Sequence, residues 1–132
     1  MGQPAAKMGD KVVALDTHIY MIPTPGGPVP TPLPSPFNGM LQLGLSTNVM
    51  IEGKPAATVN SIAVNLPPHM PQGGPFQKPP TNQGKITIGS TTVFINGKPA
   101  ARMGDTAMTC NDPVDLPIGK VIVQGVCKVL IG

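Results

Sequence analysis

Apolar residues occur along this chain in short runs, each about five residues long and bounded by Gly, Pro or polar residues. The runs come in pairs: a Gly precedes mainly β-branched or aliphatic residues, a short turn such as Gly89-Ser90 follows, and a second apolar run comes next. This is the pattern of a β-hairpin. Windows of about ten residues with a helical period all contain Gly or Pro. The pattern therefore predicts an all-β chain of short hairpins.

The paired runs repeat along the chain. "GMLQLGLSTNVMIEGKPAA" (39–57) aligns with "GKITIGSTTVFINGKPAA" (84–101), with the apolar residues in step, and "GKVIVQGVCKVLIG" (119–132) ends the sequence. Each of the first two copies is a predicted hairpin followed by a Lys-Pro-Ala-Ala loop, and we call this unit a module. Hairpins this short are marginally stable alone, so we expect the modules to stack on one another.

The third module lacks its loop. It stops at Ile131-Gly132, and the missing loop stands at the other end of the chain as Gln3-Pro4-Ala5-Ala6. This split predicts a closed arrangement of three modules, with approximate internal threefold symmetry and with the two termini close together. A linear β-solenoid is the alternative, but it would leave the first loop without a preceding hairpin.

Proline is concentrated in two segments, residues 22–39 and 65–84, among 18 Pro and 16 Gly in the chain. Alternating proline favours extended polyproline II geometry, which is stiff before it packs. We expect both segments to be long loops that buttress the outer face of the hairpins. They could instead serve as ligands for proline-binding domains.

Composition narrows the class of protein. The 132 residues are sufficient for one domain, and with three Phe, one Tyr and no Trp its core must be built from Val, Ile, Leu and Met. Only 11% of residues are charged, which argues against disorder. The net charge of +3 comes from scattered Lys and Arg, which does not favour a nucleic-acid surface. No apolar segment resembles a signal peptide or membrane helix, so we expect a cytoplasmic chain with reduced cysteines.

The repeat brings candidate metal ligands into register. His18 and His69, the two histidines of the chain, stand at equal distances after Pro4 and Pro55. The third module has Pro113 at that position, but Cys110 stands three residues earlier. Under threefold closure these side chains would converge on the axis, and imidazole and thiolate are ligands that zinc prefers. Taken singly, a loop His is more often a surface residue and a Cys a buried apolar group.

Two further sets of residues leave alternatives open. Cys127, at the predicted turn of the third hairpin, could supply a fourth ligand only if the hairpin turns point towards the apex. Asp10 and Asp105 share a module position and could either orient an imidazole or fix the turn after the Pro-Ala-Ala loop. The turn is favoured, because Ser61 stands at that position in the middle module and can make a similar contact.

The segment "GSTTVFINGKPAARMGD" (89–105), matched more loosely at 45–61, resembles the PAAR-repeat proteins, and "PTPGGPVPTPLPSPF" is similar to PAAR-like domains. The resemblance implies a small cone that caps the trimeric β-helical (VgrG-like) spike of a contractile injection machine, such as a type VI secretion system or a phage-tail-like particle. It also implies a zinc ion near the point, held by His and Cys. The family's "DxTxHGG" reads here as Asp16-Thr17-His18-Ile19-Tyr20, without the glycines.

We therefore expect an all-β, cone-shaped single domain over residues 1–132, with no effector extension. Its expected function is a structural tip that caps and sharpens a homotrimeric spike, with one copy per trimer, a zinc cofactor and no catalytic residues. It would stay in the cytoplasm until assembly, then leave with the spike and contact a target membrane mechanically. An effector-loading adaptor is an alternative. A small zinc hydrolase is disfavoured, because the chain has six acidic residues and few aromatic residues to line a cleft.

Overall fold

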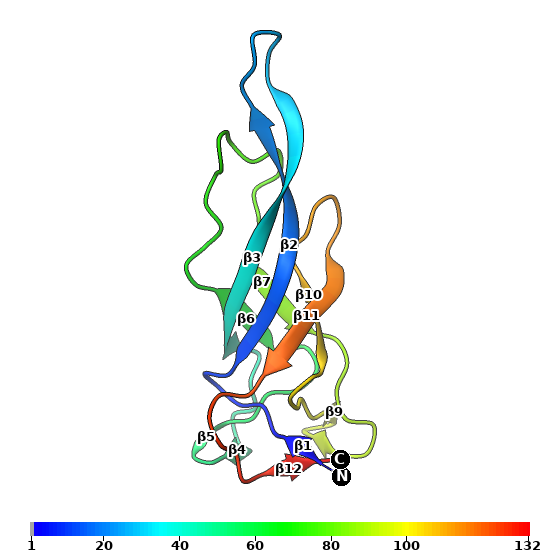
Figure 1. The fold of residues 1–132 in the computed structure, drawn as a ribbon. Coiled ribbons are helices and arrows are strands. Elements are labelled where there is room, and N and C mark those ends of the chain that lie inside the picture. Colours follow the sequence, from blue (N-terminus) through cyan, green and yellow to red (C-terminus); the bar gives the residue numbers. More distant parts are fainter. Residues whose placement is uncertain (1) are drawn as a thin grey trace.

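A computed structural model describes residues 2–132 and confirms the predicted fold class: the regular secondary structure in this range is entirely β. The molecule is elongated, and both termini lie at one end, which we call the base (Figure 1). No helix within residues 2–132 is long and apolar enough to cross a membrane. The strands are β1 (Gln3–Pro4), β2 (Lys11–Ile22), β3 (Val29–Leu43), β4 (Met50–Ile51), β5 (Lys54–Pro55), β6 (Ile62–Asn65), β7 (Gln83–Ile86), β8 (Phe94–Ile95), β9 (Lys98–Pro99), β10 (Thr106–Thr109), β11 (Leu116–Ile122) and β12 (Leu130–Ile131).

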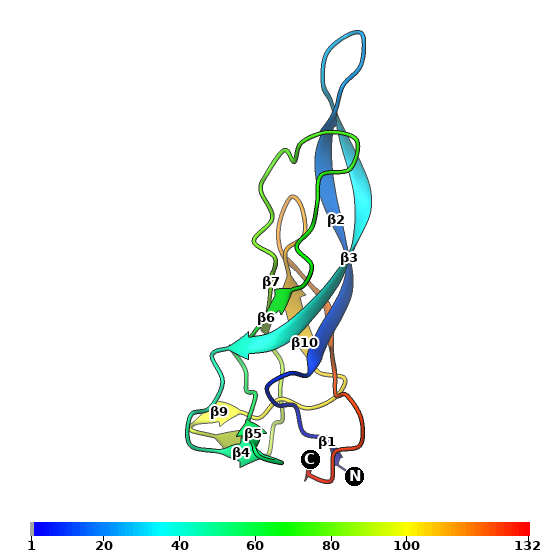
Figure 2. The same ribbon diagram turned by 90° about the vertical axis from the view of Figure 1, so that its left-hand side faces the viewer.

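Six strands close into a barrel in the order β10-β11-β2-β3-β6-β7. It consists of three antiparallel hairpins, β2–β3, β6–β7 and β10–β11, each joined to its neighbours by further strand pairing. The β2–β3 hairpin is the longest and projects beyond the others as the far end of the molecule, which we call the distal end (Figures 1 and 2).

The base contains three two-stranded sheets, β4–β5, β8–β9 and β1–β12. The first two are hairpins whose turn residues, Glu52-Gly53 and Asn96-Gly97, all have positive φ, as type I′ turns require. In the third sheet the two ends of the chain pair, with Gln3 opposite Ile131 and Pro4 opposite Leu130. The predicted closure is therefore confirmed, and the chain opens where the other modules have their hairpin turn.

The predicted pairing within each module was wrong. The two apolar runs of a module do not form a hairpin with each other, because the first run ends a barrel strand. The second run pairs with the Lys-Pro that follows it in the first two modules and with Gln3-Pro4 in the third. The physical reason is the Glu-Gly or Asn-Gly pair that follows the second run. This pair forms a two-residue turn, which closes a tighter hairpin than the longer segment between the two runs could close. That longer segment instead carries the chain from the barrel to the base (Figure 2).

The two proline-rich segments also differ from each other. Residues 29–37 are part of strand β3 rather than a loop, which corrects the expectation for the first segment. The second segment forms a long connection between β6 and β7, as expected. It lies along β2, where the Met21 amide donates to the Pro75 carbonyl at 2.7 Å and the Gln77 amide donates to the Ile19 carbonyl at 2.8 Å.

The repeated Pro-Ala-Ala loops meet at the end of the base that adjoins the barrel. The Ala6 amide donates to the Ala101 carbonyl, the Ala57 amide to the Ala6 carbonyl, and the Ala101 amide to the Ala57 carbonyl, each at 3.0 Å. These three bonds form a closed ring with one alanine from each module, and we call it the alanine ring. All three side chains are fully buried. Each module thus places a small, fully buried side chain where the three backbones bond to one another.

The barrel core lies on the distal side of this ring. Each module contributes an aliphatic side chain from β3, β7 or β11, namely Leu41, Ile86 and Val121, and all are buried. One Phe37 ring fills the next layer, where a Cβ atom on Gly39 would lie 2.6 Å from the ring. The absence of a side chain at Gly39 is what allows a single aromatic residue to occupy the barrel interior.

The turn after each alanine loop is closed by a short polar side chain. The Lys7 amide donates to Asp10 Oδ2 at 3.0 Å, and the Arg102 amide donates to Asp105 Oδ2 at 2.7 Å. In the middle module the Thr58 amide donates to Ser61 Oγ at 2.9 Å. The prediction that these positions fix the turn is confirmed, and Ser61 makes the contact that aspartate makes in the other modules.

Candidate metal centre

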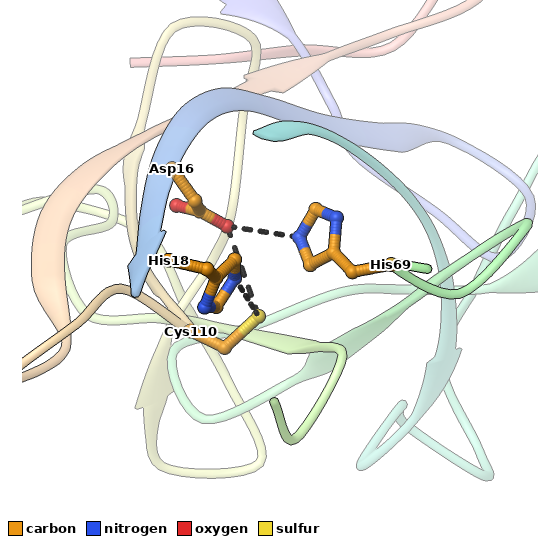
Figure 3. Close-up of side chains that lie close together, drawn as sticks. All are labelled: Asp16, His18, His69 and Cys110. Carbon is orange, nitrogen blue, oxygen red and sulfur yellow. Dashed lines mark hydrogen bonds and ion pairs between the residues drawn. The ribbon is translucent and has the colours of Figure 1, made fainter. Parts of the chain in front are cut away.

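Four side chains with metal-ligating atoms lie together in the barrel, on the distal side of Phe37. Asp16 and His18 come from β2, His69 from the β6–β7 connection, and Cys110 directly follows β10 (Figure 3). One nitrogen, oxygen or sulfur atom of each residue lies within 4.8 Å of the corresponding atom of every other. We call this set the ligand cluster.

Strand geometry explains how β2 supplies two members. Successive side chains of a strand point to opposite faces, so Asp16 and His18 share the inward face. Both residues are almost completely buried. The Thr109 hydroxyl donates a hydrogen bond to Asp16 Oδ1, while Oδ2 faces His69 and Cys110. The carboxylate is thus held with one oxygen directed at the other members of the cluster.

The two residues that follow Cys110 form hydrogen bonds with the backbone of β2. Asn111 Oδ1 accepts from the Thr17 amide at 2.7 Å, and Asp112 Oδ2 accepts from the Ile19 amide at 3.0 Å. The Asp112 amide donates to the Thr17 carbonyl at 2.8 Å. These bonds fix the start of the β10–β11 connection beside β2 and thereby place the Cys110 thiol against the β2 side chains.

The two imidazoles have unused nitrogen atoms. His18 Nε2 lies 3.9 Å from Cys110 Sγ, and its Nδ1 lies 3.4 Å from Asp112 Oδ2. His69 Nε2 lies 3.5 Å from Asp16 Oδ2. Within residues 2–132, buried His69 Nε2 and His18 Nδ1 have no hydrogen-bond partner. A buried polar atom without a partner costs free energy, so His69 Nε2 in particular is oriented as a ligand atom would be.

The protonation states of the cluster favour a bound cation. Burial, followed by the nearby His18, lowers the pKa of His69. Burial and the adjacent Asp16 carboxylate raise the pKa of the Cys110 thiol to about 11. Both shifts disfavour the charged form of the side chain, because burial removes solvent from both groups, His18 places a like charge beside His69, and Asp16 places a like charge beside a Cys110 thiolate. A divalent ion would supply positive charge beside Asp16 and Cys110 and would stabilise the thiolate.

The donor set fits a metal of borderline softness. Two imidazole nitrogens, one thiolate sulfur and one carboxylate oxygen are the atoms that zinc binds in proteins, and four protein donors complete a tetrahedral site. Calcium and magnesium would instead need a shell of oxygen atoms. The cluster can therefore hold a metal ion, and its chemistry is compatible with zinc.

The structure brings together three of the four residues that the sequence suggested. His18, His69 and Cys110 are in the cluster, whereas Cys127 is not. Cys127 follows β11, on the way back to the base, where its thiol contacts the carbonyl oxygens of Ala5 and Val129 at 3.7 and 3.5 Å. The expectation of Cys127 as a fourth ligand required this turn to point towards the apex, and the chain runs in the opposite direction.

Asp16 is the member that the sequence reasoning missed. The signal was present, because "DTH" at residues 16–18 places an acidic residue and a histidine two positions apart. Such a spacing puts both side chains on one face of a strand. The repeat predicts hairpins before the alanine loops and does not indicate the strand that carries Asp16 and His18.

Comparison with known proteins assigns the family. The family model described as PAAR motif matches residues 21–105 and, in a second match, residues 76–132. A search of curated proteins found no significant match. The two matches together extend over most of the chain, and they include both the alanine loops at 55–57 and 99–101 and the ligand-cluster residues His69 and Cys110. The chain therefore belongs to the family of PAAR motif proteins.

Proposed function

We propose that this protein is the structural tip of a contractile injection machine: its base caps a homotrimeric β-helical spike, and a zinc ion stabilises its narrow end. The observation that carries the proposal is the threefold construction of the base from a single chain. An internally threefold monomer can make equivalent contacts with each of three identical subunits. Family membership supports the same role.

The base offers a suitable apolar surface. Met50, Phe94 and Leu130 occupy the same position in β4, β8 and β12, and they are 54%, 57% and 61% exposed. The next residue in each strand is a buried isoleucine. Large apolar side chains at an exposed and repeated position contribute binding energy when a partner covers them. We infer that these three residues contact the three spike subunits.

Zinc would be held by Asp16, His18, His69 and Cys110. These residues come from β2, the β6–β7 connection and the segment after β10, so one bound ion would link all three barrel hairpins. Such a link adds to the folding free energy, because the ligands are not assembled in the unfolded chain. Four protein donors leave no open position for water, which supports a structural role over catalysis.

A groove beside the cluster offers little for a hydrolase. It has a volume of about 370 Å³ and is lined mainly by proline, leucine, methionine and amide side chains. Among the described residues, His69 is the one ionisable residue that lines it. Hydrolysis at a metal needs an accessible water and a general base beside it. The buried Asp16, whose carboxylate already interacts with Thr109, His69 and Cys110, is poorly placed for that task.

Charge substitutions at the base test the proposal. The triple variant Met50→Asp, Phe94→Asp, Leu130→Asp should lose at least about 100-fold in affinity for the spike protein encoded nearest to this chain's gene, because several anchor side chains of an interface are replaced by charges. Leu15→Asp on the outer face of β2 is the matched control, since Leu15 is similarly exposed but far along the barrel. It should bind as the unaltered chain does. Full binding by the triple variant, measured by calorimetry, would refute docking through the base.

A further inference from the structure

Strand β3 has an exposed edge near the distal end. It pairs with β2 along Val29–Met40, but β6 pairs with it only between Gly39 and Leu43. Among the described residues, no strand or isolated bridge pairs with the other edge of residues 29–37. At Asn38 that edge is already bonded, since the Asn38 amide donates to Asn65 Oδ1 and the Leu66 amide donates to the Asn38 carbonyl. The β2–β3 hairpin projects past the rest of the barrel at this point (Figure 1). Long unpaired strand edges are templates for pairing with other chains.

The hydrogen bonds of β2 reveal which β3 residues point towards that edge. The amides of Thr17, Ile19 and Met21 bond to Asn111, Asp112 and Pro75, all on the side of β2 away from β3. In an antiparallel pair, the backbone N–H and C=O groups of two directly opposite residues either both bond across the pair or both point away from the partner strand. The β3 residues opposite these three must therefore direct their backbone groups to the exposed edge.

Those β3 positions are all prolines. Pro30 is opposite Met21, Pro32 opposite Ile19, and Pro34 opposite Thr17; Pro36 continues the series opposite Leu15. All four prolines are exposed. Gln72 Nε2 donates to the Pro34 carbonyl at 3.4 Å, which places that carbonyl on the outer edge as the register requires. Since proline has no N–H group, this edge carries carbonyl acceptors but no amide donors between residues 30 and 36.

The alternation leaves the other edge of β3 intact. Thr31, Leu33, Ser35 and Phe37 lie opposite Tyr20, His18, Asp16 and Ala14, the β2 residues that bond towards β3. None of these four is a proline, so the β2–β3 ladder keeps its donors. This explains how a segment with a proline at every second position forms a strand at all: prolines are tolerated in an edge strand when the missing N–H would face solvent.

We propose that the four alternating prolines close the outer edge of the β2–β3 hairpin to strand addition, and so prevent a second copy of this chain from pairing there. Pairing by strand addition needs donors and acceptors on both strands. A second β3 strand would meet a row of carbonyl groups opposite its own carbonyl groups. Two members of the ligand cluster, Asp16 and His18, lie on β2 in this same hairpin, so the closed edge also keeps the strand that carries them from being drawn into an intermolecular sheet.

Restoring the missing amides tests the proposal. The triple variant Pro30→Thr, Pro32→Thr, Pro34→Thr returns three N–H donors to the edge and adds polar, strand-favouring side chains rather than apolar area. We expect its mass in sedimentation experiments to double with increasing concentration. The matched control is Pro23→Thr, Pro25→Thr, Pro28→Thr, which changes three exposed prolines of the same hairpin outside the strands. The control and the unaltered chain should stay monomeric.

Hydrogen exchange identifies the contact. The new amides of residues 30, 32 and 34 should become protected only in the associated form of the triple variant. A folded triple variant that stays monomeric up to its solubility limit would overturn the proposal, as would association of the control to the same extent. If the triple variant does not fold, the single variant Pro32→Thr serves as the test. A weaker but reversible doubling of its mass with concentration supports the proposal that the prolines close the edge. A folded variant that stays monomeric at every concentration contradicts it.

Discussion

The base and the distal half of this molecule differ in symmetry. In the base, each module supplies one alanine to a ring of three hydrogen bonds at 3.0 Å and one two-stranded sheet. In the distal half, the β6–β7 connection is much longer than the other two, and only the β2–β3 hairpin extends beyond the others (Figure 2). One chain is thus threefold at one end and asymmetric at the other.

This difference separates two structural requirements. A surface that meets three identical subunits needs three equivalent patches, and the repeat supplies them. A buried site with nitrogen, sulfur and oxygen donors needs different residues from each module, so the repeat must diverge there. The middle module supplies His69 from a long connection, and the third supplies Cys110 in place of a histidine.

The alanine ring should be the most sensitive part of the base. Ala57→Leu adds a larger side chain where three backbones meet and should lower the free energy of unfolding by about 3 kcal/mol, because overpacking a closed core forces the backbone apart. Denaturant unfolding measures the change. Thr47→Leu, at an exposed position, is the control and should change stability by less than about 0.5 kcal/mol. Equal stability of the two variants would show that the ring does not hold the modules together.

Removal of the metal should loosen the distal half and leave the base intact. At a free zinc concentration about 100-fold above Kd, bound metal contributes about 2.7 kcal/mol, which chelation or Cys110→Ser should abolish. Hydrogen exchange should then speed up around Cys110 and His69, while the amides of the alanine ring stay protected. Cys127→Ser should retain the metal, because that thiol lies near Ala5. Loss of zinc from Cys127→Ser, or uniform loosening of both halves, would contradict this division.

The sequence predicted the symmetric half better than the asymmetric half. The threefold repeat, the closure at the termini and the turn role of Asp10 and Asp105 follow from local patterns that recur, and the structure confirms them. The strand pairing within a module was wrong, because a pattern of apolar runs does not state which run pairs with which. The strand character of residues 29–37 was missed for a related reason: whether a proline is compatible with a strand depends on which edge its nitrogen faces, and that requires the register with β2.

The ligand cluster was likewise predicted only in part. The register of His18, His69 and Cys110 was visible in the repeat, but Asp16 requires knowing that β2 continues through residue 18 with its even-numbered side chains inside the barrel. The placement of Cys127 depends on the direction in which a connection leaves the barrel. Such long-range features are set by packing between modules rather than by residues close in sequence.

Acid should destabilise the metal-free protein through the distal half. The pKa of His69 is lowered in the folded chain by burial and then by His18, whereas an unfolded histidine titrates near 6.5. The unfolded chain therefore takes up a proton first, so stability is complete above about pH 6.5 and falls as the pH drops below it. Denaturant midpoints of the chelated protein at about pH 8 and about pH 5 measure the effect. His69→Gln should weaken this dependence, and an unchanged dependence in that variant would exclude His69 as its source.

Moving the chain opening should have the smallest effect. Joining residue 132 to residue 1 and reopening the chain between Asn96 and Gly97 places the ends in an equivalent type I′ turn of the base. Because the modules are equivalent here, the permuted chain should fold and lie within about 1 kcal/mol of the parent in stability. An opening inside the alanine ring, between Ala56 and Ala57, should prevent folding. Failure of the first permutant with a folded parent would contradict the equivalence of the three base sheets.

Native mass spectrometry of the complex between this chain and its spike examines both halves of the molecule in one experiment, because the mass gives the number of each chain and the presence of a metal ion. We expect one copy of the chain, three copies of the spike protein and one zinc ion. The triple base variant should leave the spike as a free trimer, and Cys110→Ser should give the same protein stoichiometry without zinc. Three copies of the chain on one trimer, or a complex of the native chain that contains no metal, would contradict the account.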